Sequence, residues 1–337
     1  MNASGKNTKR WLAEAPSNIA LIKYMGKTDS SKNHPTNGSL SYTLPHLKSI
    51  VELELETQPG HDVWLPLENH EGKKLDPISL SEKSSARFLS HLDRLKQHFG
   101  FSGNFVVRSA NDFPSDCGLA SSASSFAALT MAAVKALTEL TGKKELTARE
   151  AAELSRLGSG SSCRSFFAPW AVWDNEGVHP APGLGHAPLL HQCIVVEENV
   201  KAVSSSQAHL RVSSSLLFEG RPERANQRLH DLREALIAHN WPTAFEITWA
   251  DMWDMHALFE TSRPSFSYMT AGSLEVLRRV RKETWESVGE GPLVTMDAGP
   301  NVHLLYRHDD RGRAMAQKIQ QEFSQRYRII ASPELSK

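Results

Sequence analysis

The sequence predicts an α+β fold in which helices are segregated on a mostly antiparallel sheet. In residues 51–56 three apolar residues alternate with three glutamates, which is the pattern of a half-exposed strand. Residues 126–140 place apolar residues at helical spacings, so they predict a helix with one apolar face. Near the carboxyl end, residues 292–297 and 302–306 have the pattern of two strands joined by a turn that contains Gly-Pro.

The first part of the chain is predicted to consist mainly of strands. Residues 11–24 predict a strand that turns at Pro16-Ser17-Asn18 into a second extended piece. A loop is predicted over residues 28–38, the segment SLSYTL (39–44) follows, and residues 51–56 predict a further strand. The Gln-Pro-Gly turn that follows predicts a hairpin with residues 61–65.

Helices follow, and capping signals mark their ends. An apolar stripe predicts a helix over residues 88–99 that ends at Gly100, a residue suited to a left-handed conformation. After a strand over residues 104–110 and the helix from residue 126, a capping box at 147–150 predicts a helix that runs to Gly158.

A composition change divides the chain. Residues 174–190 are rich in glycine and proline, and a new strand is predicted from residue 191. We therefore expect two domains, residues 1–190 and 191–337. The second is predicted to contain, in order, a strand, three helices, two strands, a helix and a strand.

Charge and cysteine content exclude several classes of protein. The 337 residues include 38 Lys+Arg and 38 Asp+Glu, so no overall field would attract nucleic acid or an anionic membrane. Three widely spaced cysteines without a C-x-x-C pair argue against structural zinc or a disulfide framework. No apolar run approaches the ~20 residues that span a bilayer, and the amino terminus has no apolar core. We therefore expect a soluble, cytoplasmic protein.

Residues 111–126 are the first candidate for a binding site. They join a predicted strand to a predicted helix through small residues, among them Gly118, Ala120 and Ala123. Backbone N–H groups at the start of a helix are unpaired, and their partial positive charge attracts phosphate. The hydroxyls of Ser121 and Ser122 could add contacts to phosphate or to its Mg²⁺. An ordinary helix capped by serine explains the local pattern equally well.

Residues 158–165 repeat this composition, with glycines, serines and one cation, Arg164. A flexible Gly/Ser linker is the alternative interpretation. The strongly apolar residues 166–173 follow at once and argue against it.

Asp297 lies at the end of an apolar predicted strand, before the Gly-Pro turn. Its carboxylate either stabilises that turn or acts as a general base, which requires a nearby cation to keep it ionised. Lys23 and Lys27 are the candidate cations. Two solvated lysines are the simpler interpretation of that segment alone.

Six blocks of the sequence together resemble the signature motifs of the diphosphomevalonate decarboxylase family, a branch of the GHMP superfamily of small-molecule kinases. The combination of KYxGK with DAGPN is specific to the decarboxylase branch. The blocks spread over nearly the whole chain: APSNIALIKYMGK (15–27), NGSLSYTL (37–44), NDFPSDCGLASSASSFAAL (111–129), GSGSSCRS (158–165), MHALFETSRPSFSYM (255–269) and TMDAGPNVHLLY (295–306).

The resemblance implies a GHMP kinase fold. Its amino-terminal domain would resemble domain 2 of ribosomal protein S5 and its carboxyl-terminal domain would be ferredoxin-like, with ATP and substrate between them. The implied enzyme uses ATP and Mg²⁺ to phosphorylate the tertiary 3-hydroxyl of mevalonate 5-diphosphate. Loss of phosphate and CO₂ then gives isopentenyl diphosphate, a step of the mevalonate pathway of isoprenoid biosynthesis. Dimers are common in the family, so a homodimer fits the resemblance.

The same resemblance implies roles for particular residues. Asp297 matches the aspartate that faces the 3-hydroxyl, and Lys23 matches the lysine near that aspartate and the reacting carboxylate. Arg164 matches the partner of the substrate carboxylate. The other substrate-binding positions are Asn18, Tyr24, Lys27, Ser159 and Ser161. The positions that cradle the ATP phosphates are Gly118, Leu119, Ala120, Ser121, Ser122 and Ala123, with Ser121 and Ser122 near Mg²⁺.

Four residues in three blocks depart from the family pattern. Met25 replaces a tryptophan, Gly38 enters the NSSLS block, and Ala208-His209 replace a Gly-Met pair after the serines at 204–206. These changes leave open how strictly the 5-diphosphate is required over the monophosphate, and no motif marks the adenine pocket. The competing interpretations are a kinase of mevalonate or its monophosphate that does not decarboxylate, a monophosphate decarboxylase, and a non-catalytic ligand sensor.

Overall fold

The computed structural model describes residues 9–58, 60–75, 80–113, 121–185, 188–198 and 202–335. The chain forms two compact units that alternate along the sequence: the described residues of unit 1 lie within 9–17, 47–113 and 121–166, and those of unit 2 within 18–46 and 167–335. Strands and helices are mixed in both, which confirms the predicted α+β class. The predicted division at residue 190 stays a prediction.

Two long strands replace the three shorter pieces predicted for the amino-terminal region. β1 (Arg10–Ile22) is one strand of 13 residues and does not turn at Pro16. It pairs with β4 alone among the described strands, and a proline is tolerated at such an edge because no ladder donor is needed there. β4 (Ser39–Glu56) is one strand of 18 residues. Pro45 lies in the stretch where β4 changes partner, between its pairing with β9 and its pairing with β8.

In unit 1, the second half of β4 pairs antiparallel with β8 (Asn104–Asn111). β5 (Val63–Pro66) pairs with β8 in parallel, so the predicted hairpin of this segment with residues 51–56 is wrong. The physical reason is that β8 occupies the edge of β4 that a hairpin would need. The short strands β6 (Asn69–His70) and β7 (Lys73–Lys74) pair with each other.

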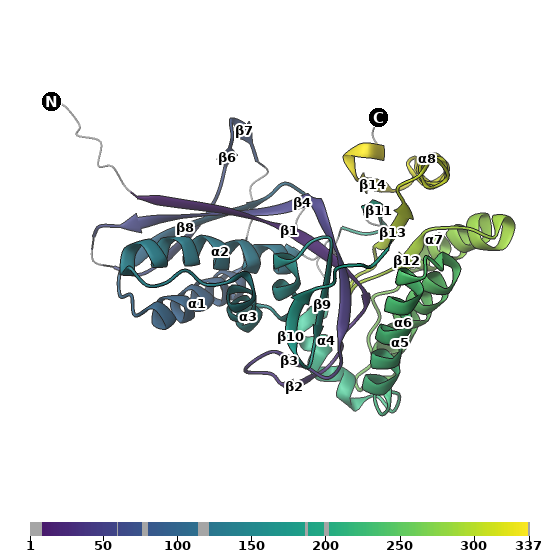
Figure 1. Cartoon of the computed structure of the whole chain (residues 1–337), viewed down its shortest axis with the longest axis horizontal. Helices are drawn as coiled ribbons and strands as arrows, with labels where there is room; N and C mark the ends of the chain where they lie inside the picture. The colour runs from purple at the N-terminus through teal and green to yellow at the C-terminus, as the bar shows by residue number, and fades with distance from the viewer. Residues whose placement is uncertain are drawn as a thin grey trace. The chain divides into compact units, whose positions relative to one another are not determined.

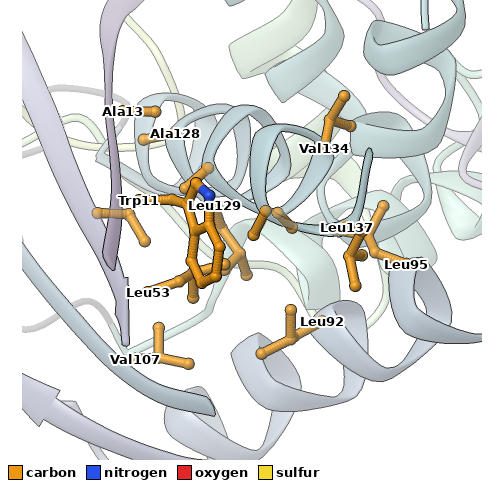
Figure 2. Close-up of a cluster of buried hydrophobic side chains, with 14 of the residues drawn as sticks. Trp11, Ala13, Leu53, Leu92, Leu95, Val107, Ala128, Leu129, Val134 and Leu137 are labelled. Carbon is orange, nitrogen blue, oxygen red and sulfur yellow. The ribbon is translucent and has the colours of Figure 1, made fainter. Parts of the chain in front are cut away.

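Three helices cover the sheet of unit 1: α1 (Glu82–Phe99), α2 (Ser121–Thr141) and α3 (Ala148–Gly158) (Figure 1). α1 ends at Gly100, which has φ of 66° as the sequence predicts. α3 begins with the predicted capping box of Thr147 and Glu150. Apolar side chains from the strands and helices form one core, and Figure 2 shows Trp11, Leu53, Leu92, Val107 and Leu129 among them.

His91 is buried beside this core, and its Nε2 lies 2.9 Å from Thr130 Oγ1. Burial, and then the positive charges of Arg94 and Arg87, lower the pKa of His91 from 6.5 to about 3. Between these values the unfolded chain binds a proton that the folded chain does not. The free energy of unfolding therefore falls as the pH drops from 6.5 toward 3, by up to ~1.4 kcal/mol per pH unit for this residue.

We expect His91→Gln to unfold with uptake of about one proton fewer than the wild type between these pH values, so that its free energy of unfolding depends less on pH. The measurement is urea unfolding at pH 5 and at pH 7, with His98→Gln as the matched control because His98 is exposed on the same helix. An unchanged difference between the two pH values in His91→Gln would contradict the assignment.

The described residues of unit 2 contain most of the helices, the paired strands β2 (Lys27–Asp29) and β3 (His34–Pro35), part of the six-stranded sheet that also includes β8 and β5, and a second, four-stranded sheet. The first half of β4 pairs with β9 (Trp170–Asp174), which pairs with β10 (Gly177–Pro180). The second sheet has the order β12-β13-β11-β14 and is antiparallel throughout. Its strands are β11 (Leu189–Val195), β12 (Leu293–Thr295), β13 (Val302–Arg307) and β14 (Arg328–Ala331).

The helices of unit 2 include one that was not predicted, α4 (Ser205–Arg211), which Ser204 and Gln207 begin with a capping box. Its signal is short, and the run of serines before it hides it. α5 and α6 pack side by side (Figure 1). The other elements are η2 (Val212–Ser214), α5 (Arg221–Ile237), α6 (Trp241–Thr261), α7 (Ala271–Arg281), η3 (Lys282–Glu286), α8 (Asp310–Phe323) and η4 (Pro333–Leu335). Among the described residues, none of the helices has the length and apolar character needed to span a bilayer.

Candidate active site

The structure brings Lys23 and Asp297 into direct contact within unit 2. Lys23 follows the last residue of β1, and Asp297 follows β12 by two residues. Lys23 Nζ donates to Asp297 Oδ1 at 2.5 Å and to the Ala20 carbonyl at 2.8 Å. The lysine side chain is 4% exposed and that of the aspartate 28%. A buried ammonium at this distance favours the ionised carboxylate, and the partial exposure leaves the carboxylate able to meet a ligand.

His256 on α6 is a titratable group close to Lys23 and Asp297. Burial, and then the positive charge of Lys23, lower the pKa of His256 to about 3. His256 is therefore neutral at pH 7 and adds no second positive charge beside Lys23.

The turn that follows Lys23 carries another of the predicted residues, Tyr24. The Tyr24 ring stacks on His209 with centroids 4.6 Å apart and meets Trp173 edge to face at 4.8 Å. His209 Nδ1 accepts a hydrogen bond from Gly26 N–H at 3.1 Å. His209, one of the residues that depart from the family pattern, therefore helps to hold this turn.

Lys27 and Asn18 occupy different positions in unit 2. Lys27 Nζ donates to Asn33 Oδ1 at 2.7 Å, and Lys27 is partly exposed. The structure thus gives Asp297 its cation in Lys23, while Lys27 pairs with an amide. Asn18 is buried in β1 with 2% exposure.

Ser159, Ser161 and Arg164 belong to unit 1. Ser159 ends α3, and η1 (Gly160–Phe166) follows at once with Ser161 and Arg164 in it. Ser162 Oγ donates to the Ser159 carbonyl at 2.6 Å, and Arg164 is 4% exposed. This segment is a buried helical turn, so the linker interpretation is wrong.

Cys163 shares η1 with Arg164. Burial raises the pKa of the Cys163 thiol to about 12. The thiol is therefore protonated at pH 7 and is not a nucleophile. Arg164 is the one cationic side chain in η1, and its guanidinium can donate hydrogen bonds to an anion.

Three of the six predicted phosphate-binding residues lie in α2, and the other three precede it. Ser121, Ser122 and Ala123 form its first turn, while Gly118, Leu119 and Ala120 lie outside the described residues. Ser121 is half-buried and Ser122 is exposed. No group of three or more His, Cys, Asp or Glu side chains within the described parts of the chain could hold a metal ion. The hydroxyls of Ser121 and Ser122 would fit Mg²⁺ as oxygen ligands beside nucleotide phosphates and water.

Sequence reasoning missed two charged residues that surround Lys23, Arg221 and Asp251. Both side chains are 0% exposed, and Arg221 Nη1 lies 2.7 Å from Asp251 Oδ1. A signal for Asp251 exists in the sequence, because it falls at helical spacing among the buried residues Ala244, Thr248 and Met255 of α6. A carboxylate in such a stripe requires a partner.

Comparison with known proteins extends over the whole chain. Residues 15–179 match the family described as diphosphomevalonate decarboxylase-like N-terminal domain, and residues 192–334 match the mevalonate 5-diphosphate decarboxylase C-terminal domain. The diphosphomevalonate decarboxylase of Candida albicans is 31% identical over 328 residues, which cover 90% of this chain and 85% of that protein. The chain belongs to the diphosphomevalonate decarboxylase family. The Debaryomyces hansenii relative is 30% identical and covers 90% of this chain and 81% of its own length.

Solved structures of the family agree with this fold. The mevalonate diphosphate decarboxylase of Legionella pneumophila is 47% identical, with a TM-score of 0.88 over 96% of this chain and 100% of that chain. A structure described as MDDEF in complex with MVAPP, AMPPCP and magnesium is 29% identical, with a TM-score of 0.81 over 97% of this chain and 98% of that chain. The predicted GHMP kinase fold is therefore confirmed.

Proposed function

We propose that this chain is an enzyme that converts mevalonate 5-diphosphate and ATP into isopentenyl diphosphate, ADP, phosphate and CO₂. The observation that carries the proposal is the 2.5 Å contact of Lys23 Nζ with Asp297 Oδ1. It supplies a half-buried carboxylate with a fixed positive charge, which is what a base for a poorly acidic alcohol needs. Membership of the decarboxylase family supports the choice of substrate.

In the first step, Asp297 accepts the proton of the 3-hydroxyl while the hydroxyl oxygen bonds to the γ-phosphorus of ATP and ADP leaves. A tertiary alcohol is a poor nucleophile, so orientation and local charge must supply most of the rate. Lys23 contributes by holding Asp297 ionised and in place.

In the second step, the new phosphate leaves carbon 3 with the electron pair of its C–O bond. The bond between the carboxylate and carbon 2 breaks, its electron pair forms the double bond between carbons 2 and 3, and CO₂ departs. Arg164 would bind the carboxylate until then, because its planar guanidinium can donate two parallel hydrogen bonds.

The other predicted residues bind the two anionic substrates. Ser159 and Ser161 precede Arg164 in the sequence and would bind the substrate beside it. Asn18, Tyr24 and Lys27 would hold the part of the substrate that carries the diphosphate. The first turn of α2 would receive the ATP phosphates, with the hydroxyls of Ser121 and Ser122 toward Mg²⁺. When bound, Mg²⁺ neutralises phosphate charge during transfer.

The deciding experiment measures CO₂ and ADP together with mevalonate 5-diphosphate as substrate. We expect one CO₂ for each ADP. Release of ADP without CO₂ would reject decarboxylation and favour a kinase. Binding of both ligands without turnover would favour a ligand sensor. Mevalonate 5-phosphate in the same assay measures how strictly the second phosphate is required.

We expect Arg164→Lys to lower kcat/KM by about 10²-fold, because a lysine cannot reproduce two parallel hydrogen bonds to a carboxylate. The matched control is Arg156→Lys, since Arg156 is also buried but donates to Glu153, an acceptor that a lysine can also serve. Wild-type kinetics in Arg164→Lys would show that Arg164 has a structural role instead.

A further inference from the structure

The main-chain groups of Lys23 are held by side chains from three other segments. Lys23 lies one residue beyond the end of β1, where the strand pairing stops. Its N–H donates to Asp251 Oδ2 at 2.9 Å. Its carbonyl accepts from Arg221 Nη2 at 3.1 Å and from Asn37 Nδ2 at 3.1 Å. Arg221 and Asp251 thus bind both sides of the same residue.

Arg221 and Asp251 are also bound to each other. Arg221 is the first residue of α5 and Asp251 lies in the middle of α6. Their 2.7 Å ion pair is fully buried, and Arg221 Nη1 also lies 3.5 Å from Asp254 Oδ2. Burial of two charges costs free energy that apolar residues of similar volume would not cost. Stability alone is therefore a weak explanation for this pair.

We propose that Arg221 and Asp251 are positioning residues that set the ammonium of Lys23 against Asp297. The pair binds the backbone N–H and carbonyl of Lys23, which fixes the position of its main chain. The side chain of Lys23 then extends to Asp297. A displacement of about 1 Å in a catalytic group can cost ~10²-fold in rate. The inference rests on the proposed function, because it concerns the same Lys23–Asp297 contact.

The neighbouring arginines provide a control. Arg224 binds Asp254 at 2.9 Å, and its side chain is 41% exposed. Burial raises the pKa of Asp254, but hydrogen bonds from Arg224 and Arg228 outweigh it, so the pKa lies below its usual value. Arg224 therefore belongs to the charge cluster around Asp254 on the same two helices, and its hydrogen bonds go to Asp254 and to the carbonyls of Leu217 and Glu219.

The first test replaces both charges with apolar residues in the double variant Arg221→Met/Asp251→Leu. Such replacements of buried pairs commonly preserve folding. We expect kcat to fall by at least ~30-fold, with KM for ATP within ~3-fold and a cooperative thermal transition retained. Arg224→Met should keep kcat within ~3-fold. A folded double variant with kcat within ~3-fold of wild type would overturn the proposal.

Arg221→Lys is the conservative variant. It keeps a positive charge beside Asp251, but a single ammonium cannot reproduce the forked donation to Asp251 and to the Lys23 carbonyl. We expect it to fold and to lose about 10-fold in kcat, between wild type and the double variant. Wild-type kcat in Arg221→Lys would also overturn the proposal, even if the double variant did not fold.

A double-mutant cycle with Lys23→Met separates positioning from general damage. If the pair acts through Lys23, replacing it in the Lys23→Met background should lower kcat by less than ~3-fold more. If the fall in kcat of the combined variant equals the product of the falls caused by Lys23→Met and by the pair replacement, the proposal is rejected. The wild-type protein in the same assay tests the proposed function separately, because absence of turnover there would reject the reaction and not the positioning.

Discussion

Asp297→Asn should lower kcat by about 10³-fold while the dissociation constant of ATP stays within a few-fold of the wild-type value. The substitution keeps the size of the side chain and removes its ability to accept a proton. General bases contribute ~10²–10⁴-fold, and this contribution is made in the transition state and not in nucleotide binding. The measurements are steady-state kinetics with mevalonate 5-diphosphate and nucleotide binding by titration.

The control for this variant is Asp310→Asn, because Asp310 is an exposed carboxylate at the start of α8. It should leave both quantities unchanged. Near-normal kcat in Asp297→Asn would remove Asp297 from the role of base. A loss of ATP affinity as large as the loss of kcat would instead point to a role in nucleotide binding.

Lys23→Met should lower kcat by about 10²- to 10³-fold, because it removes the charged partner that lies 2.5 Å from Asp297. Methionine keeps the apolar length of a side chain that is 4% exposed. Loss of the ammonium makes protonation of Asp297 easier, so the acid side of the pH-rate profile should move to higher pH. Activity should then recover in part as the pH rises.

The pH response distinguishes the two variants. Asp297→Asn has no carboxylate to ionise, so it should show no recovery at higher pH. Lys32→Met is the control for Lys23→Met, since Lys32 is exposed in the turn between β2 and β3. A wild-type pH profile in Lys23→Met would mean that the lysine does not control the ionisation of Asp297.

The amino-acid sequence determined the features that depend on neighbours in the chain. The apolar stripe of α2, the capping box of α3 and the left-handed Gly100 after α1 were all predicted correctly. Each of them reflects side-chain spacing or a backbone preference that acts over a few residues. The chemical nature of Asp297 and Lys23, and the family motifs around them, were also evident in the sequence.

The tertiary structure decided everything that depends on which segments become neighbours. β5 joined β8 in parallel rather than forming a hairpin, because strand pairing depends on which edge is free and not on the turn alone. Lys23 and Asp297 are 274 residues apart in the sequence and meet at 2.5 Å. Arg221 and Asp251, the buried pair that binds the backbone of Lys23, lie on two different helices. No local sequence pattern predicts how these helices pack. Local signals specify elements, but a site assembled from distant segments exists only after the chain has packed.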